Sequence, residues 1–79
     1  MTTTQLLSQI PARSQAQVIR FSPHIDHNLR ERLLAYGLIP GQQIQVLAQK
    51  PLTLLLIDYT ELALEKELAN CVEVSRLSS

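Results

Sequence analysis

The chain has 79 residues, of which 46% are hydrophobic and 18% charged, and its seven basic and seven acidic side chains cancel. This composition is typical of a folded domain and excludes a disordered tail, so we expect one domain over residues 1–79. The balanced charge argues against nucleic-acid binding, because phosphate contacts need an excess of lysine and arginine.

Cysteine content and hydropathy predict a cytoplasmic protein that does not insert into the membrane. Cys71 is the single cysteine, so no intrachain disulfide can form, which is typical of a reducing compartment. We expect its side chain to fill a small space in the core. The start of the chain lacks the charged leader and apolar run of a secretory signal. The longest aliphatic run, residues 54–57, is far too short to span a bilayer.

The start of the chain predicts a helical turn followed by a strand. Residues 6–10 place three aliphatic side chains before Pro11, which predicts one turn that closes an end of the core. Residues 14–22 are rich in β-branched and aromatic side chains, with Ala16 and Val18 on one side, and predict a strand.

Apolar residues recur at helical spacing over residues 25–36 and predict an α-helix with one apolar face. That face consists of Ile25, Leu29, Leu33 and Tyr36. The residues before it leave two possible starts. Ser22 could cap the helix with Pro23 at its first position, or Asp26 could cap a helix that begins later.

The chain has two glycines, Gly37 and Gly41, and both follow this helix closely. Gly37 lies where a residue with positive φ ends a helix in a Schellman motif, and Leu38 and Leu33 would then make the closing apolar contact. Pro40 and Gly41 fit the central positions of a type II turn, whose third residue needs a positive φ. We therefore expect a corner that directs the chain into a strand, with no catalytic role.

The rest of the chain predicts four strands and one helical turn. The strands cover residues 43–49, 52–58, 61–65 and 71–76, and the helical turn covers residues 66–70. We expect a tight turn at residues 58–60, and Asn70 in the left-handed conformation where the helical turn ends. The whole pattern predicts a mainly β protein, a small, partly closed β-barrel of about five strands with one inserted α-helix.

Most of the sequence resembles the ferrous-iron transport protein A (FeoA) family. Residues 29–46, LRERLLAYGLIPGQQIQV, match the family pattern R-L-x-x-x-G-L-x-P-G-x-x-[VI]-x-V. The matching positions are Arg32, Leu33, Gly37, Leu38, Pro40, Gly41, Ile44 and Val46. Further positions that agree with the family are Leu7, Ile10, Pro11, Leu62, Ala63, Leu64, Ala69, Val72 and Val74.

The resemblance implies an SH3-like barrel that serves as a cytoplasmic accessory of bacterial ferrous-iron uptake. The implied partner is a cytoplasmic region of the large membrane iron transporter that carries its own GTPase domain (FeoB-like). A role in assembly, regulation or stabilisation is left open, as is the oligomeric state. One alternative is an SH3-like module related to the C-terminal domain of metal-dependent transcriptional repressors; another is a different small-barrel adaptor. A complete repressor is disfavoured, because these 79 residues contain no DNA-binding domain.

Neither a catalytic motif nor a glycine-rich phosphate loop occurs in the sequence, so we expect no enzymatic activity and no cofactor. His24, His27 and Glu31 have ligand types suited to divalent iron or zinc at helical spacing. They are the candidates for a metal site. Solvated polar residues at an exposed helix start are the commoner explanation, and we expect no metal there.

Four residues are candidates for partner binding. Leu34 flanks the apolar face of the helix, and Leu47 interrupts the polar side of strand 43–49. Arg30 and Arg32 border that region, and arginine is favoured at protein interfaces. The alternative is that the two leucines only pack beneath the helix or against a neighbouring strand.

Charge is unevenly distributed along the chain. Residues 1–50 carry five basic and two acidic side chains, a sum of +3, whereas residues 51–79 carry two basic and five acidic ones, a sum of −3. Such a charge separation could orient the protein on a partner, although a randomly decorated surface explains it equally well.

Overall fold

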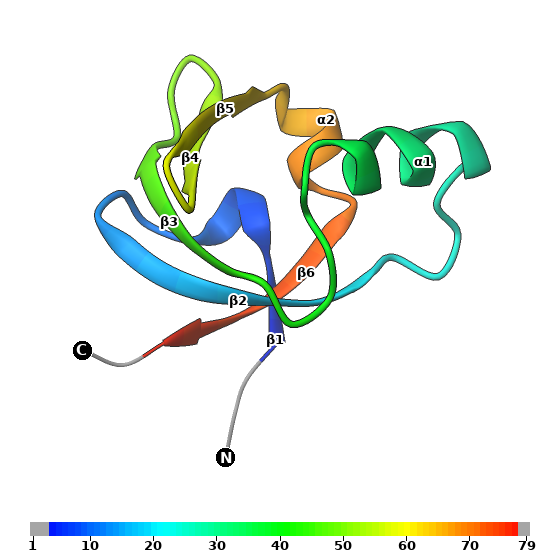
Figure 1. Ribbon diagram of the computed structural model, residues 1–79, viewed down its shortest axis with the longest axis horizontal. Coiled ribbons are helices and arrows are strands. Elements are labelled where there is room, and N and C mark those ends of the chain that lie inside the picture. The colour runs from blue at the N-terminus through cyan, green and yellow to red at the C-terminus, as the bar shows by residue number, and fades with distance from the viewer. Residues whose placement is uncertain (1–3, 78–79) are drawn as a thin grey trace.

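The computed structural model describes residues 4–77, which form a six-stranded antiparallel sheet curled into a partly closed barrel (Figure 1). In chain order the elements are β1 (Thr4–Leu6), the 3-10 helix η1 (Leu7–Gln9), β2 (Ser14–Phe21), α1 (His27–Ala35), β3 (Gln43–Ala48), β4 (Thr53–Ile57), β5 (Thr60–Leu64), α2 (Lys66–Ala69) and β6 (Val72–Leu77). The strands lie side by side in the order β1, β6, β2, β3, β4, β5, so β1 and β5 are the edges. The mainly β, partly closed barrel with one inserted helix is confirmed.

One strand, β1, was not predicted. Thr4 pairs with Ser75 and Leu6 with Glu73, so β1 adds to the outer side of β6. The helical turn expected over residues 6–10 is shorter and is formed by η1. A strand of three residues is too short to show a recognisable alternation of apolar and polar side chains.

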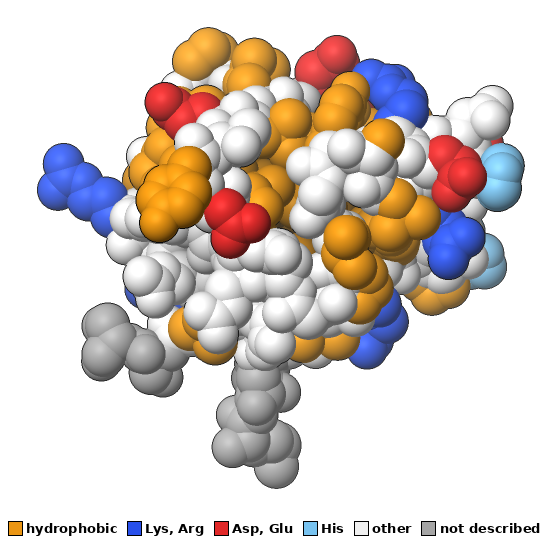
Figure 2. Space-filling view, in the orientation of Figure 1, with side chains coloured by type: hydrophobic (Ala, Val, Ile, Leu, Met, Phe, Trp, Pro, Cys, Tyr) orange, Lys and Arg blue, Asp and Glu red, His pale blue; other side chains and the backbone are white. Residues whose placement is uncertain are grey.

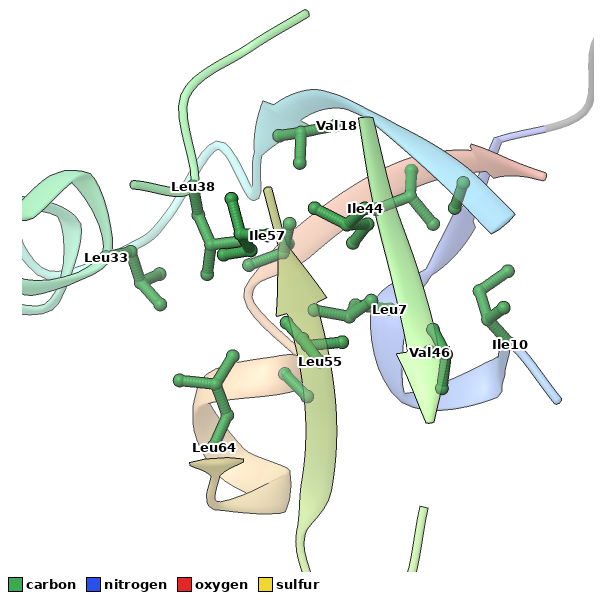
Figure 3. Packing of buried hydrophobic residues seen from close by; sticks show 14 of the residues in the cluster. Leu7, Ile10, Val18, Leu33, Leu38, Ile44, Val46, Leu55, Ile57 and Leu64 are labelled. Carbon is green, nitrogen blue, oxygen red and sulfur yellow. The ribbon is translucent and has the colours of Figure 1, made fainter. Parts of the chain in front are cut away.

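Alternate strand residues point into the barrel and form its core (Figure 3). In β3, for example, Ile44 and Val46 are buried, and the neighbouring glutamines are not. Leu33 of α1 and Ile10 after η1 lie at opposite sides of this cluster in Figure 3. Cys71 packs against the core while remaining partly exposed. The buried apolar residues are Leu7, Ile10, Ala16, Val18, Leu33, Leu38, Ile44, Val46, Leu55, Ile57, Leu64, Leu68, Ala69, Val72 and Val74.

Helix α1 has the later of its two possible starts. Asp26 is the N-cap, and its Oδ1 accepts a hydrogen bond from the backbone N–H of Asn28 at 2.9 Å. The start at Ser22 and Pro23 is wrong, because the N–H of Ile25 donates to the carbonyl of Ser22 at 3.1 Å and closes a turn there. Proline fits the second position of such a turn, since its ring fixes φ at a suitable value.

The end of α1 is the expected Schellman motif. Gly37 has φ +95°, and its N–H donates to the carbonyl of Leu34 at 3.0 Å. The N–H of Leu38 donates to the carbonyl of Leu33 at 3.1 Å. Both of these leucines are fully buried, as the closing apolar contact requires.

The turn after α1 is the expected type II turn, and it is attached to β2. The N–H of Gln42 donates to the carbonyl of Ile39 at 2.9 Å, and Gly41 has φ +95°. The N–H of Gly41 also donates to the carbonyl of Val18 at 2.7 Å, and the N–H of Val18 donates to the carbonyl of Gln42 at 2.9 Å. These bonds hold Pro40 next to the end of β2.

The end of α2 differs from the prediction. Asn70 has φ −69° and ψ −12°, which is right-handed, so the expected left-handed conformation is wrong. The reason is that its N–H donates to the carbonyl of Lys66 at 2.9 Å and continues the helical turn. The chain then enters β6 after a further bond from the N–H of Cys71 to the carbonyl of Leu68 at 3.0 Å.

A partly buried side-chain network attaches η1 to the sheet. Gln49 follows β3, and its Nε2 donates to the backbone carbonyls of Leu7, at 3.0 Å, and Ile10. Its Oε1 accepts a hydrogen bond from Oγ1 of Thr53 at 2.7 Å. One glutamine thus fixes the position of the 3-10 helix that closes this end of the core.

Candidate partner-binding groove beside helix α1

An open groove lies between α1, the end of β2 and the turn at Pro40, and we call it the α1 groove. It is lined by Arg20, Phe21, Ser22, Pro23, Ile25, His27, Arg30, Leu34 and Pro40. In Figure 2, blue, pale-blue and red side chains lie around apolar ones on the side of the molecule where α1 lies. The groove therefore combines apolar and cationic side chains from four consecutive segments.

The helix register explains which α1 residues face the groove. His27, Arg30 and Leu34 are three and four residues apart, so they share one face of the helix. Leu29 and Leu33 lie on the adjacent face and pack toward the core. The Asp26 cap and the Gly37 exit fix the two ends of α1, and the groove face keeps its direction because both ends are anchored.

The groove's cationic side chains are not equivalent. Nε of Arg20 lies 2.8 Å from Oε1 of Glu73, the one ion pair within residues 4–77, and this contact partly neutralises its charge. Arg30 is exposed and has no such carboxylate partner among the described residues. Arg30 is consequently the groove charge most available to an anionic group of a partner.

Two of the four predicted partner-binding residues lie in the groove and two do not. Arg30 and Leu34 line it together, whereas Arg32 and Leu47 do not. Nη2 of Arg32 lies 3.5 Å from the hydroxyl of Tyr36, and this hydrogen bond raises the pKa of the guanidinium above its usual value. Leu47 is half-buried where the pairing of β3 with β4 shifts register.

Phe21 and Ile25 are groove residues that the sequence reasoning did not select. Both are half-buried and pack against the core from outside. By strict alternation Phe21 would face away from Ala16 and Val18, but the pairing of β2 with β6 shifts register after Val18 and puts Phe21 opposite the buried Val72. No local pattern in the sequence indicates that shift.

The metal candidates do not form a cluster. His24 lies in the turn before α1, whereas His27 and Glu31 are on the helix, and all three are exposed. No group of three or more potential ligand side chains gathers in the part of the chain that the structure describes. Within the same residues, neither helix has the length and hydropathy of a membrane-spanning segment.

The fold defines a small SH3-like barrel with an inserted helix. Comparisons with known proteins identify the family to which it belongs. The family model of the FeoA domain matches residues 5–76. The chain therefore belongs to the FeoA domain family. A search of curated proteins finds no match.

Solved structures agree with this assignment. An iron uptake regulatory protein (FeoA) has a TM-score of 0.85 and 30% identity, covering 95% of this chain and 100% of that chain. A FeoA-like protein from Clostridium acetobutylicum has a TM-score of 0.85 and 23% identity, covering 100% of this chain and 93% of that one. IdeR of T. acidophilum has a TM-score of 0.87 at 20% identity, but the match covers 35% of that chain and shows the fold alone.

Proposed function

We propose that this protein is a cytoplasmic accessory of bacterial ferrous-iron uptake that binds a cytoplasmic region of the membrane GTPase iron transporter (FeoB-like) and catalyses no reaction itself. Membership of the FeoA family is the observation that carries this proposal. The barrel supplies a rigid support, and the α1 groove supplies the contact surface.

The chemistry of the groove indicates what part of the transporter would fit. Phe21, Ile25 and Leu34 offer apolar area, and exposed Arg30 offers a cation that is not neutralised within the described chain. Interfaces commonly combine an apolar centre with arginine and a polar rim. The complementary segment would carry an apolar side chain next to a carboxylate.

The fold shared with IdeR motivates a second candidate, an SH3-like module that contacts a metal-dependent repressor or another regulatory protein. The two candidates differ in the protein that the α1 groove would recognise. Gene order discriminates between them cheaply. A neighbouring gene for a large membrane protein with a GTPase domain supports the first candidate, and one for a DNA-binding metalloregulator supports the second.

Co-purification with the tagged transporter tests the proposal directly. Membranes containing the transporter are solubilised and incubated with the folded protein at low salt, with and without guanine nucleotide. Specific retention is expected, because the groove and the charge distribution favour association at low ionic strength. If the folded protein is never retained in either nucleotide condition, the proposed function is wrong.

Groove variants show whether retention depends on the proposed surface. Leu34→Asp places a charge in the groove and should reduce retention strongly, whereas Leu34→Met keeps an apolar side chain of similar volume and should be tolerated. Circular dichroism of both variants verifies that the barrel is folded.

A further inference from the structure

Strand β5 is an edge strand with outward-facing backbone groups. It is last in the sheet order and pairs only with β4. The hairpin loop has two residues, begins at Asp58 with φ +56°, and brings Ile57 opposite Thr60. The closing pair of such a hairpin exchanges its hydrogen bonds, so Glu61 and Ala63 direct their N–H and C=O groups away from β4. No further backbone hydrogen bond within residues 4–77 reaches these four groups.

This edge is accessible, and acidic side chains are the one feature it has that discourages strand addition. The side chains of Glu61 and Ala63 are exposed, and Leu62 between them is half-buried. Proline, lysine and a bulge, which commonly protect edges, are all missing from β5. In Figure 2, apolar side chains are visible in the hollow between the β4–β5 hairpin and the chain that leads from α1 to β3.

The hairpin end of this edge is acidic. Asp58 and Glu61 are exposed, and neither forms an ion pair within the described residues. The nearby cations, Lys50 and Lys66, line a separate hollow at the far end of β5. Negative charge at the hairpin end disfavours pairing with a second copy of the same edge, because like charges would face each other.

We propose that the β5 edge is a docking site for an extended segment of a partner protein that alternates apolar and basic side chains and adds to the sheet as a further strand. Its backbone would pair with Glu61 and Ala63, as in other cases of strand addition. Its apolar side chains would lie beside Leu62, and its basic ones beside Glu61. Lysine and arginine are enriched in the cytoplasmic loops of membrane proteins. The proposal does not depend on the α1 groove or on the proposed function.

Titration of the isotope-labelled full chain with a model peptide tests the proposal. The probe is the N-acetylated, C-amidated hexapeptide Lys-Val-Lys-Val-Lys-Val, and Glu-Val-Glu-Val-Glu-Val is the matched control. With the basic peptide, amide shifts should concentrate in residues 60–64, and hydrogen exchange at Glu61 and Ala63 should slow at least about tenfold. The acidic peptide should bind at least about tenfold more weakly.

A pair of substitutions separates strand addition from simple charge attraction. Ala63→Pro removes the outward N–H, which β4 does not use, and should weaken peptide binding at least about tenfold. Ala63→Val keeps that N–H and should bind as the wild type does. If Ala63→Pro fails to fold, the slowing of hydrogen exchange at the Glu61 and Ala63 amides of the wild type, on addition of the basic peptide, tests strand addition instead.

Three results would overturn the proposal. The first is the absence of shifts at millimolar peptide, and the second is a set of shifts centred away from β5. The third is self-association of the free protein through β5, detected by light scattering and abolished by Ala63→Pro, because the occupant would then be a second copy. Failure of transporter co-purification with intact peptide binding would refute the proposed function alone.

Discussion

Gly37 shows how the backbone conformation of one residue fixes the corner after α1. A Cβ added there would have its nearest neighbour, Cγ2 of Ile57, at 4.0 Å, which is ordinary contact. Space is therefore available, and the need for glycine arises from φ +95° alone. Residues with a Cβ are disfavoured at this φ, and β-branched ones most of all.

We expect Gly37→Val to lower the free energy of unfolding by at least ~1–2 kcal/mol, a large share of the stability of so small a domain. Gly37→Asn should lose clearly less, because asparagine tolerates positive φ better. Thermal unfolding of the two purified variants measures the difference. A valine variant that melts within about a degree of the wild type would contradict the Schellman motif.

Gln49 is a second position where a single side chain matters. Gln49→Leu would leave the carbonyl of Ile10 and the hydroxyl of Thr53 without the partners they have now. The expected loss of unfolding free energy is about 1–3 kcal/mol, the usual effect of unpaired buried polar groups.

The matched control for this experiment is Gln45→Leu. Gln45 is also a half-buried glutamine next to β4 but makes no side-chain hydrogen bond with other residues in the range 4–77. Its substitution should change stability by less than about 0.5 kcal/mol. Equal effects of the two substitutions in urea unfolding would show that the network around Gln49 adds nothing.

At the scale of elements, most of the fold could be predicted from local pattern. The strand at Gln43–Ala48 follows from alternation, and the end of α1 follows from the chirality that Gly37 permits. Strand β1 could not be predicted, because its three residues are ordered by pairing with β6, a contact over a long sequence distance. The conformation of Asn70 also depended on a hydrogen bond to Lys66 and not on residue preference.

The α1 groove was only partly predictable for a related reason. Helical periodicity places Arg30 on one face and Arg32 on another once the helix boundaries are known. The other walls of the groove, at Phe21 and Pro40, become neighbours of Arg30 only through the bonds that tie the type II turn to β2. No local pattern in the sequence contains that long-range contact.

The exposed start of α1 allows a test of the metal hypothesis. We expect the double variant His24→Ala, His27→Ala to unfold at the wild-type temperature within about a degree. Neither side chain is buried, and neither belongs to a group of three potential ligands among residues 4–77. Anaerobic calorimetric titration with ferrous iron should show no stoichiometric binding to the wild type. Micromolar binding that disappears in the double variant would contradict this expectation.

At the scale of the whole molecule, the two proposed docking surfaces carry charges of opposite sign. Arg30 lies in the α1 groove, and Asp58 and Glu61 lie on the β4–β5 hairpin. The +3 and −3 halves of the sequence are otherwise intermixed in the barrel, since Arg20 pairs with Glu73, and Lys50 and Lys66 line one hollow. A partner that engages the groove should be attracted electrostatically, and this attraction should weaken as salt rises to ~0.5 M.

Binding of the iron transporter through the α1 groove is tested most directly by comparing two charge reversals on the same helix. The affinity of the purified transporter for wild type, Arg30→Glu and Arg32→Glu is measured by biolayer interferometry at low salt. We predict that Arg30→Glu weakens binding at least about tenfold and that Arg32→Glu, outside the groove, weakens it less than about threefold. If the wild type binds and both charge reversals leave the affinity unchanged, or both weaken it equally, the α1 groove is not the binding surface.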